Sequence, residues 1–179
     1  PTRSSPSQEV GSYFFMAEKE IYLDNNATTQ PLAEVRGAMI SVLGENFGNA
    51  SSAHFTGERA RKYLAEARDN IAELINGNPS NLIFTGSGTE ANNLVLMSCL
   101  KDKKLLEIVT SSVEHSSILK TCEYLSGNGA AVSLLAVDSS GLINLKELEA
   151  AVSKSTSLVS IQWVNNETGV IQPIEEIVQ

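Results

Sequence analysis

The chain has 179 residues, 42% of them hydrophobic and 19% charged, and its 13 basic and 21 acidic side chains give a formal net charge of -8. This size fits one globular domain or a large part of one. The acidic balance excludes a nucleic-acid surface, which needs clustered Lys and Arg, and the apolar runs are far shorter than the roughly 18 residues of a membrane span.

The first segment, residues 1–17, begins with a stretch rich in Ser, Pro and Gln that has no hydrophobic period. Such a stretch buries too little apolar area to offset the entropy of ordering it. We therefore expect these residues to be a disordered leader or tag. A processed targeting segment is one form that such a leader takes. The remaining residues, 18–179, are expected to form a single domain.

Two helices are predicted before the main strands, after a short extended segment at residues 21–23. The first opens at Pro31 and ends at Gly44, which would act as a left-handed cap. Its expected buried residues are Leu32, Val35, Met39 and Leu43. The second spans residues 57–76, with a regular apolar stripe, and Gly77 is the expected cap.

Four core strands alternate with helical segments in the rest of the chain. The strands are predicted at residues 82–85, 107–110, 131–137 and 157–164, and the helices at residues 90–101, 116–125 and 145–154. This alternation predicts an α/β fold with a partial doubly wound, mainly parallel sheet. The last run, residues 173–178, begins like an amphipathic helix, so we expect the chain to end inside a larger domain.

The two cysteines have no cluster of further Cys or His residues near them in the sequence. Neither a disulfide framework nor a metal site is expected, and a reducing, cytoplasmic location is the default, with the mitochondrial matrix as the alternative. Cys99 and Cys122 are expected to be buried or half-buried in helices. Trp163 is expected in the core, and His54 in a structural hydrogen bond.

A glycine-rich loop joins the first predicted core strand to a helix, at the strand end where α/β sheets bind ligands. Its sequence is TGSGTE, residues 85–90. Gly86 and Gly88 let the backbone approach a ligand, and the first N–H groups of the helix with the hydroxyls of Ser87 and Thr89 could hold a phosphate. The same loop contains the S-x-x-E pattern of a capping box, which needs no ligand, so both interpretations stay open.

Two further polar loops also follow predicted strands. His115 lies just before a helix, where it could stack on a ligand, transfer a proton or simply cap the helix. Asn165 and Asn166 could hold a polar ligand or form a turn with their own backbone. Three polar loops at one sheet edge together indicate a ligand site.

Five segments resemble, in order, the motifs of the cysteine desulfurases, which are pyridoxal-phosphate enzymes of the class V aminotransferase group. They are YLDNNATT (22–29), FGNASSAH (47–54), FTGSGTEANN (84–93), SVEH (112–115) and VNNETGVIQPI (164–174). The resemblance covers nearly the whole chain but only about the first half of a family member. It implies the large domain of a fold-type I pyridoxal-phosphate enzyme, present here as an incomplete domain over residues 18–179.

The resemblance also implies roles for individual residues. Gly88 and Thr89 match the pair that binds the phosphate of pyridoxal 5'-phosphate. His115 matches the catalytic histidine that stacks on the cofactor ring and assists proton transfer, and Asn166 matches the asparagine that contacts cofactor and substrate. Asn26, Ala27 and Thr28 match the segment that approaches the substrate in members of the family.

The implied reaction takes sulfur from L-cysteine to give alanine and an enzyme persulfide. The implied assembly is a homodimer or a pairing with a complementary C-terminal half, together with a sulfur-acceptor protein, as in iron–sulfur cluster assembly and other sulfur mobilisation. The family places its Schiff-base lysine, its ring-nitrogen aspartate and its persulfide cysteine after the last motif seen here. We therefore expect this chain alone to be inactive.

Other functions fit the same motifs. The chain could be a non-catalytic scaffold or interaction fragment that keeps a phosphate pocket without chemistry. It could equally belong to a selenocysteine lyase or to another class V aminotransferase that uses the same half-site.

Overall fold

The computed structural model describes residues 21–99 and 107–179, so the predicted leader and the end of the helix predicted over residues 90–101 lie outside the described residues. The chain divides into two compact units, Pro1–Gln30 and Pro31–Gln179. In the described part of the first unit, the N–H groups of Ala27 and Thr28 donate to the carbonyl of Asp24 at 3.2 and 3.3 Å. These bonds form an exposed turn.

The second unit alternates helices and strands. Its elements are α1 (Ala33–Glu45), α2 (Phe55–Leu74), η1 (Pro79–Asn81), α3 (Gly88–Ser98), β1 (Glu107–Ser111), α4 (Ser116–Gly127), β2 (Ala131–Leu135), α5 (Leu145–Ala151), β3 (Thr156–Ser160) and α6 (Ile174–Ile177). The α/β alternation predicted from the sequence is confirmed, and the predicted start of a helix after Pro173 is confirmed by α6.

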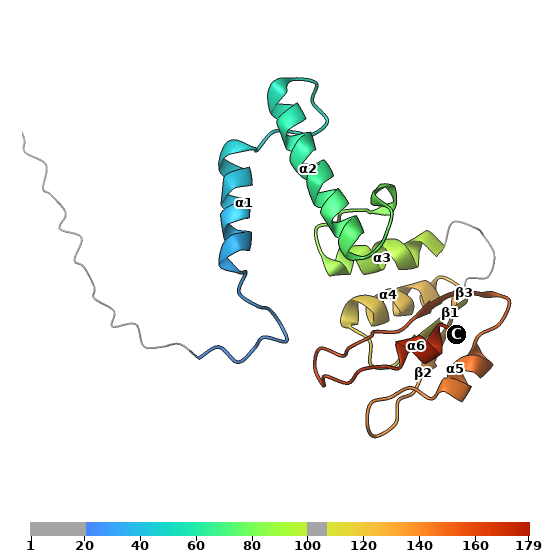
Figure 1. Ribbon diagram of the computed structural model, residues 1–179. Coiled ribbons are helices and arrows are strands. Elements are labelled where there is room, and N and C mark those ends of the chain that lie inside the picture. The colour runs from blue at the N-terminus through green and yellow to red at the C-terminus, as the bar shows by residue number, and fades with distance from the viewer. Residues whose placement is uncertain (1–20, 100–106) are drawn as a thin grey trace, which may run out of the picture. The chain divides into compact units, whose positions relative to one another are not determined.

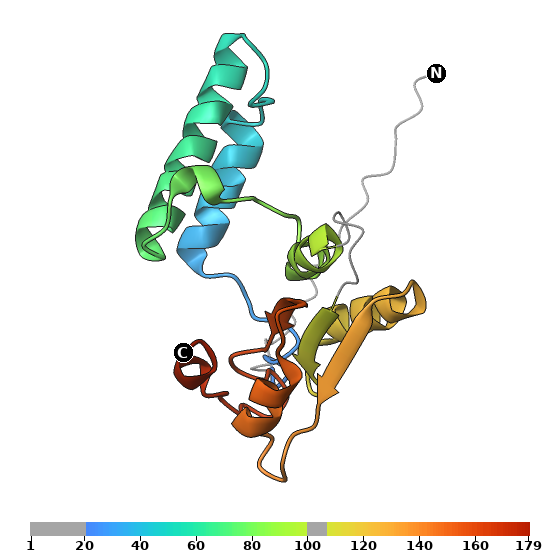
Figure 2. The ribbon, with the colours of Figure 1, turned by 90° about the vertical axis from the view of Figure 1, so that its right-hand side faces the viewer.

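The three strands form a parallel sheet in the order β2-β1-β3. Consecutive residues of a strand point to opposite faces of a sheet, and in β1 Ile108 packs with α3 and α4 whereas Val109 packs with α5. Figures 1 and 2 show α4 on one side of the strands and α5 on the other. The central strand β1 is therefore covered on both faces, as in a doubly wound fold, whereas β2 and β3 stay partly exposed.

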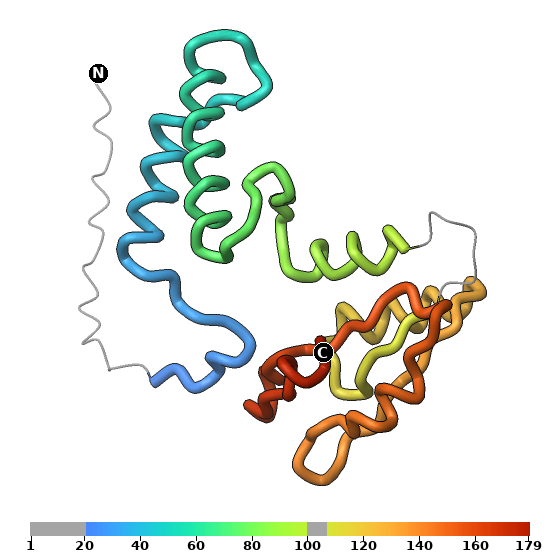
Figure 3. Tube along the Cα trace, turned by 45° about the vertical axis from the view of Figure 1, so that its right-hand side comes forward, coloured from blue at the N-terminus to red at the C-terminus, as the bar shows by residue number. Residues whose placement is uncertain are grey.

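The strand predicted at residues 82–85 does not form, because no described strand pairs with it. Instead, the Arg68 guanidinium donates to the carbonyl of Leu82 and lies 4.8 Å from the centre of the Phe84 ring. The chain runs from η1 into α3 without strand geometry (Figure 3). The apolar run gave the signal of a strand, but a strand also needs a neighbour for its backbone groups.

The first predicted helix forms, but its apolar face is not buried as expected. Leu32, Val35, Met39 and Leu43 are 47–73% exposed, and no residue of α1 is buried. Hydrophobic periodicity identifies the apolar face of a helix but not the surface that covers it, and no such surface lies among the described residues.

Two predicted helix caps and one predicted core residue are also wrong. Gly44 lies inside α1, which continues to Glu45, and the left-handed residue after α2 is Asn76, with φ 51°, rather than Gly77. Asparagine tolerates this conformation because its side chain can bond locally. Trp163 is 66% exposed rather than buried.

In residues 21–99 and 107–179, no helix has the length and apolarity needed to cross a membrane.

Candidate functional site

Helices α3 and α4 begin at the same end of the second unit. Asn92 Nδ2 donates to Ser117 Oγ at 2.9 Å, and the hydroxyl of Thr121 donates to Asn93 Oδ1 at 2.8 Å. These bonds join the second turn of α3 to the first two turns of α4, so the two helix N-termini lie close together. Because only four residues separate the end of β1 from the start of α4, both helix N-termini lie at the carboxyl edge of the strands, where the sequence predicts a ligand site.

The start of α3 is capped by Ser87 as predicted, but the Glu90 carboxylate bonds the residue before the N-cap rather than the N-cap itself. Ser87 Oγ accepts from the N–H of Glu90 at 3.1 Å, and the Glu90 carboxylate accepts from the N–H of Gly86 at 2.7 Å. No described residue accepts from the N–H groups of Gly88 and Thr89, and a Cβ added to Gly88 would meet nothing within 4 Å. The capped helix therefore still offers free N–H groups, open space and the positive end of its dipole to an anion.

His115 is the N-cap of α4, so the capping role considered from the sequence is confirmed. Its Nδ1 accepts from the backbone N–H of Ser117 at 3.1 Å and lies 2.8 Å from Ser117 Oγ. An accepting Nδ1 places the proton of the neutral ring on Nε2. Because the ring is exposed, its Nε2–H edge stays available to a ligand while Nδ1 caps the helix.

The loops after β1 and β3 are joined by two sets of hydrogen bonds. The buried carboxylate of Glu114 accepts from the hydroxyl of Ser111 at 2.7 Å and from the backbone N–H of Gln162 at 2.9 Å. The amide of Asn165 donates to the carbonyl of Val113 at 2.9 Å. These bonds hold the loop of His115 beside the loop of the two asparagines.

The two adjacent asparagines have different roles. Asn165 Oδ1 accepts from the N–H groups of Glu167 and Thr168, both at 2.9 Å, so this residue shapes the turn. Asn166 is exposed, and its bonds to other described residues are longer, at 3.3 Å, to Gln162 Nε2 and to the Glu167 carboxylate. Asn166 is therefore the member of the pair that can exchange its bonds for a ligand.

A small polar cavity of about 190 Å³ lies where these loops meet. It is lined by Asn92, Glu114, His115, Ile118, Ser160, Ile161 and Gln162. Gln162 Oε1 is buried without a described hydrogen-bond partner, and a buried acceptor without a donor is costly. Neither Gln162 nor Asn92 was predicted as a site residue, although Gln162 is an amide inside an otherwise apolar run, which is a weak signal.

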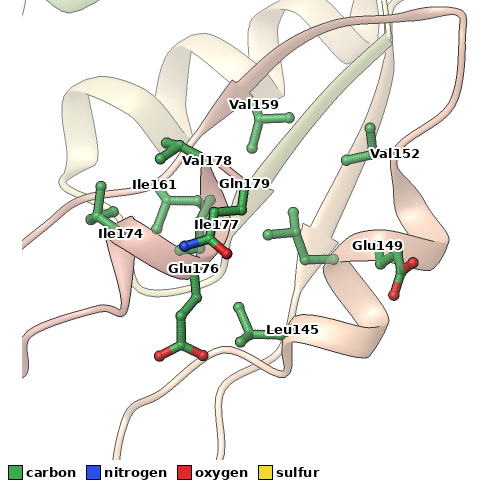
Figure 4. Close-up of a pocket in the computed structure, with 11 residues that line it drawn as sticks. Leu145, Glu149, Val152, Val159, Ile161, Ile174, Glu176, Ile177, Val178 and Gln179 are labelled. Carbon is green, nitrogen blue, oxygen red and sulfur yellow. The ribbon is translucent and has the colours of Figure 1, made fainter.

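A larger cavity, of about 740 Å³, lies elsewhere, between α5, β3 and α6. Figure 4 shows that aliphatic side chains line it, together with the carboxylates of Glu149 and Glu176. Acidic groups repel a phosphate. This cavity is therefore a poor anion site, and the polar loops at the strand ends remain the candidate.

The other predicted ligand groups belong to other segments of the chain. His54 caps α2, where its Nδ1 accepts from the N–H of Gly57 at 3.3 Å, so its predicted structural role is confirmed. Asn26, Ala27 and Thr28 lie in the exposed turn of the first unit, and their contact with substrate stays a prediction. The described residues contain no group of three or more His, Cys, Asp or Glu side chains that could hold a metal ion.

The two cysteines are expected to react very differently with alkylating reagents. Cys99 is half-buried and Cys122 only 2% exposed, and burial, with the negative charge of Glu114, raises the pKa of the Cys122 thiol. The thiolate is the reactive form, so iodoacetamide at pH 8 should label Cys122 at least about tenfold more slowly than Cys99. Peptide mass spectrometry measures both rates, and equal labelling of the folded protein would contradict the burial of Cys122.

The same raised pKa has a consequence for stability. A thiol whose pKa is higher in the folded than in the unfolded state stabilises the fold at pH values below the unfolded pKa. That contribution disappears as the pH rises through the folded pKa. The contribution of Cys122 is therefore fully present at neutral pH and is lost only in alkaline solution.

Comparison with known proteins gives one consistent family. A family model described as aminotransferase class-V matches residues 21–179. Cysteine desulfurase 2 of Trichormus variabilis is 47% identical over 158 residues, which cover 88% of this chain and 40% of the relative. The chain thus spans about 40% of the length of the curated relatives that it matches.

Solved structures are similar over the same part of the chain. A NifS-like protein has a TM-score of 0.83 and 39% identity, over 86% of this chain and 43% of that protein. A structure described as SspA in complex with cysteine has a TM-score of 0.81 and 37% identity, over 87% and 46% of the two chains. These neighbours agree with the predicted fold of the large domain.

Proposed function

The chain belongs to the class-V aminotransferase family, and we propose that it is the amino-terminal part of a cysteine desulfurase. The complete enzyme would take sulfur from L-cysteine to give alanine and an enzyme persulfide. The observation that carries this proposal is the open N-terminus of α3 at the same strand edge as His115 and Asn166. The names of the relatives and the cysteine complex of SspA support the choice of substrate.

The residues at this edge fit pyridoxal 5'-phosphate. Gly88 and Thr89 would hold its phosphate through the free N–H groups of α3 and the Thr89 hydroxyl. The exposed ring of His115 would stack beside the cofactor, and the amide of Asn166 would bind it and the substrate. When bound, the cofactor supplies an electron sink for the negative charge left when the substrate loses a proton.

The chain's own residues would bind and orient the reactants and move a proton. His115 presents Nε2 to the ligand, because Nδ1 is occupied by the cap of α4, and transfer of a proton would therefore pass through Nε2. Asn26, Ala27 and Thr28 would approach the substrate from the amino-terminal side. Asn165 and Glu114 would hold the loops in place without touching the ligand.

The remaining catalytic groups would come from outside this chain. These are the Schiff-base lysine and the cysteine that receives the sulfur, and without them residues 1–179 alone would be inactive. The complete enzyme would act in the cytoplasm as a homodimer and pass sulfur to an acceptor protein, for example in iron–sulfur cluster assembly. The names of several relatives, which include IscS, support this last assignment.

Purified complete protein tests the proposal directly. With pyridoxal 5'-phosphate and L-cysteine, we expect equimolar alanine and persulfide sulfur, and little product from other amino acids. Thr89→Ala should weaken cofactor binding by about tenfold, the value of one hydrogen bond to a charged group, as measured by fluorescence titration. Absence of cofactor binding would refute the proposal, and a preference for selenocysteine or amino-group transfer would reassign the enzyme within its family.

A further inference from the structure

We propose that Ser117 is a positioning residue, which fixes the imidazole of His115, and that Asn92 holds Ser117 in place. The three side chains form a chain of hydrogen bonds that begins on α3 and ends at the N-cap of α4. The contacts themselves are independent of the ligand. The consequence for catalysis rests on the proposed function.

The direction of this chain follows from the donor groups. The amide nitrogen of Asn92 can only donate, so Ser117 Oγ is the acceptor of their 2.9 Å bond. The hydroxyl hydrogen of Ser117 is then free to point to His115 Nδ1, at 2.8 Å. The backbone N–H of Ser117 approaches the same nitrogen at 3.1 Å.

Two donors from one residue therefore converge on Nδ1. Ser117 is 7% exposed and Asn92 is half-buried, so water competes little for these bonds. Rotation of the imidazole, or a proton on Nδ1, would break both contacts. The arrangement thus sets both the ring plane and the tautomer, in which Nε2 carries the proton, and His115 and Asn92 line the same cavity.

A second hydrogen bond between the same helices offers a matched control. The Thr121 hydroxyl donates to Asn93 Oδ1 at 2.8 Å, again a buried hydroxyl on α4 and an amide on α3. The Thr121 hydroxyl also lies 2.8 Å from the backbone carbonyl of Ser117, which Ser117→Ala retains, and among the described residues neither Thr121 nor Asn93 bonds to His115. Thr121→Val removes this bond with little change in shape, as Ser117→Ala removes the other.

The test uses the complete protein with Ser117→Ala, Asn92→Asp and Thr121→Val. Imidazole ¹⁵N shifts of His115, assigned by their loss in His115→Gln, should indicate the Nε2–H tautomer in the wild type. In Ser117→Ala, the shifts should move toward the averaged values of a ring that exchanges between its two neutral tautomers. Asn92→Asp should act similarly, because a carboxylate cannot donate and would draw the Ser117 hydroxyl away from Nδ1. Thr121→Val should leave the shifts unchanged.

Kinetics with L-cysteine supply a second measurement. Ser117→Ala should lower kcat by about tenfold and leave KM within about twofold, because the ring is misplaced while the binding groups remain. The isotope effect with α-deuterated L-cysteine should rise as proton transfer becomes slower. Thr121→Val should change neither quantity, although both variants lose a hydrogen bond between α3 and α4.

Two results would overturn the inference. One is a set of His115 shifts in Ser117→Ala that matches the wild type, and the other is an equal change of the shifts in Thr121→Val. If the wild-type protein does not turn over L-cysteine, the proposed function fails. The ¹⁵N shifts then still decide whether Ser117 positions His115, so the two failures are distinguishable.

Discussion

Replacing His115 by glutamine in the complete protein is expected to lower kcat with L-cysteine by about 10²- to 10⁴-fold, the range that positioned acid–base groups contribute. The loss is expected because the imidazole of His115 can both give up and take up a proton at Nε2. The amide of glutamine can form hydrogen bonds but cannot exchange a proton in this way. The variant also weakens the cap of α4, because the glutamine oxygen is one bond farther from the backbone than Nδ1, so this loss needs a control. Steady-state rates of alanine formation measure the effect.

His54→Gln is the matched control for this prediction. His54 is also an N-cap histidine, whose Nδ1 accepts from the N–H of Gly57 at 3.3 Å, but it caps α2 rather than α4. We expect kcat of His54→Gln to stay within about twofold of the wild type, as for most substitutions outside a site. Equal losses in the two variants would show that both histidines act only through helix stability, and would remove His115 from the proton transfer.

Much of the fold could be predicted because its local signals agree with its final packing. Glu107–Ser111 is a β-branched run followed by a loop and an amphipathic helix, and it forms β1 at the centre of the sheet. Residues 82–85 carry a similar signal but have no described neighbour, so they remain outside the sheet. The difference between these segments lies in long-range pairing, to which the local pattern is insensitive.

The candidate site shows the same division between local and distant contacts. The cap that Ser87 forms with the N–H of Glu90 follows from a spacing of three residues, and the structure contains it. The bond between Asn92 and Ser117 joins residues 25 positions apart, and it depends on how α3 and α4 align. No spacing rule predicts that alignment, because the preferred packing angles of helices still allow many axial positions.

The largest effect on stability is expected for Glu114→Leu, which should lower the free energy of unfolding by about 2–5 kcal/mol. Leucine fills a similar volume but leaves the hydroxyl of Ser111 and the N–H of Gln162 without their acceptor. Each buried group that loses its partner costs about 1–3 kcal/mol. Urea unfolding of the complete protein, followed by circular dichroism, measures the difference.

Glu114→Gln separates the hydrogen bonds from the charge. Its side-chain oxygen can accept from both donors, so the stability loss should be no more than about 1 kcal/mol. Because the negative charge of Glu114 helps to raise the pKa of the Cys122 thiol, this variant should also lower that pKa, and alkylation of Cys122 should begin at a lower pH. Wild-type stability of Glu114→Leu would show that the two loops do not depend on this carboxylate. A large loss in both variants would instead assign the stabilisation to the charge itself.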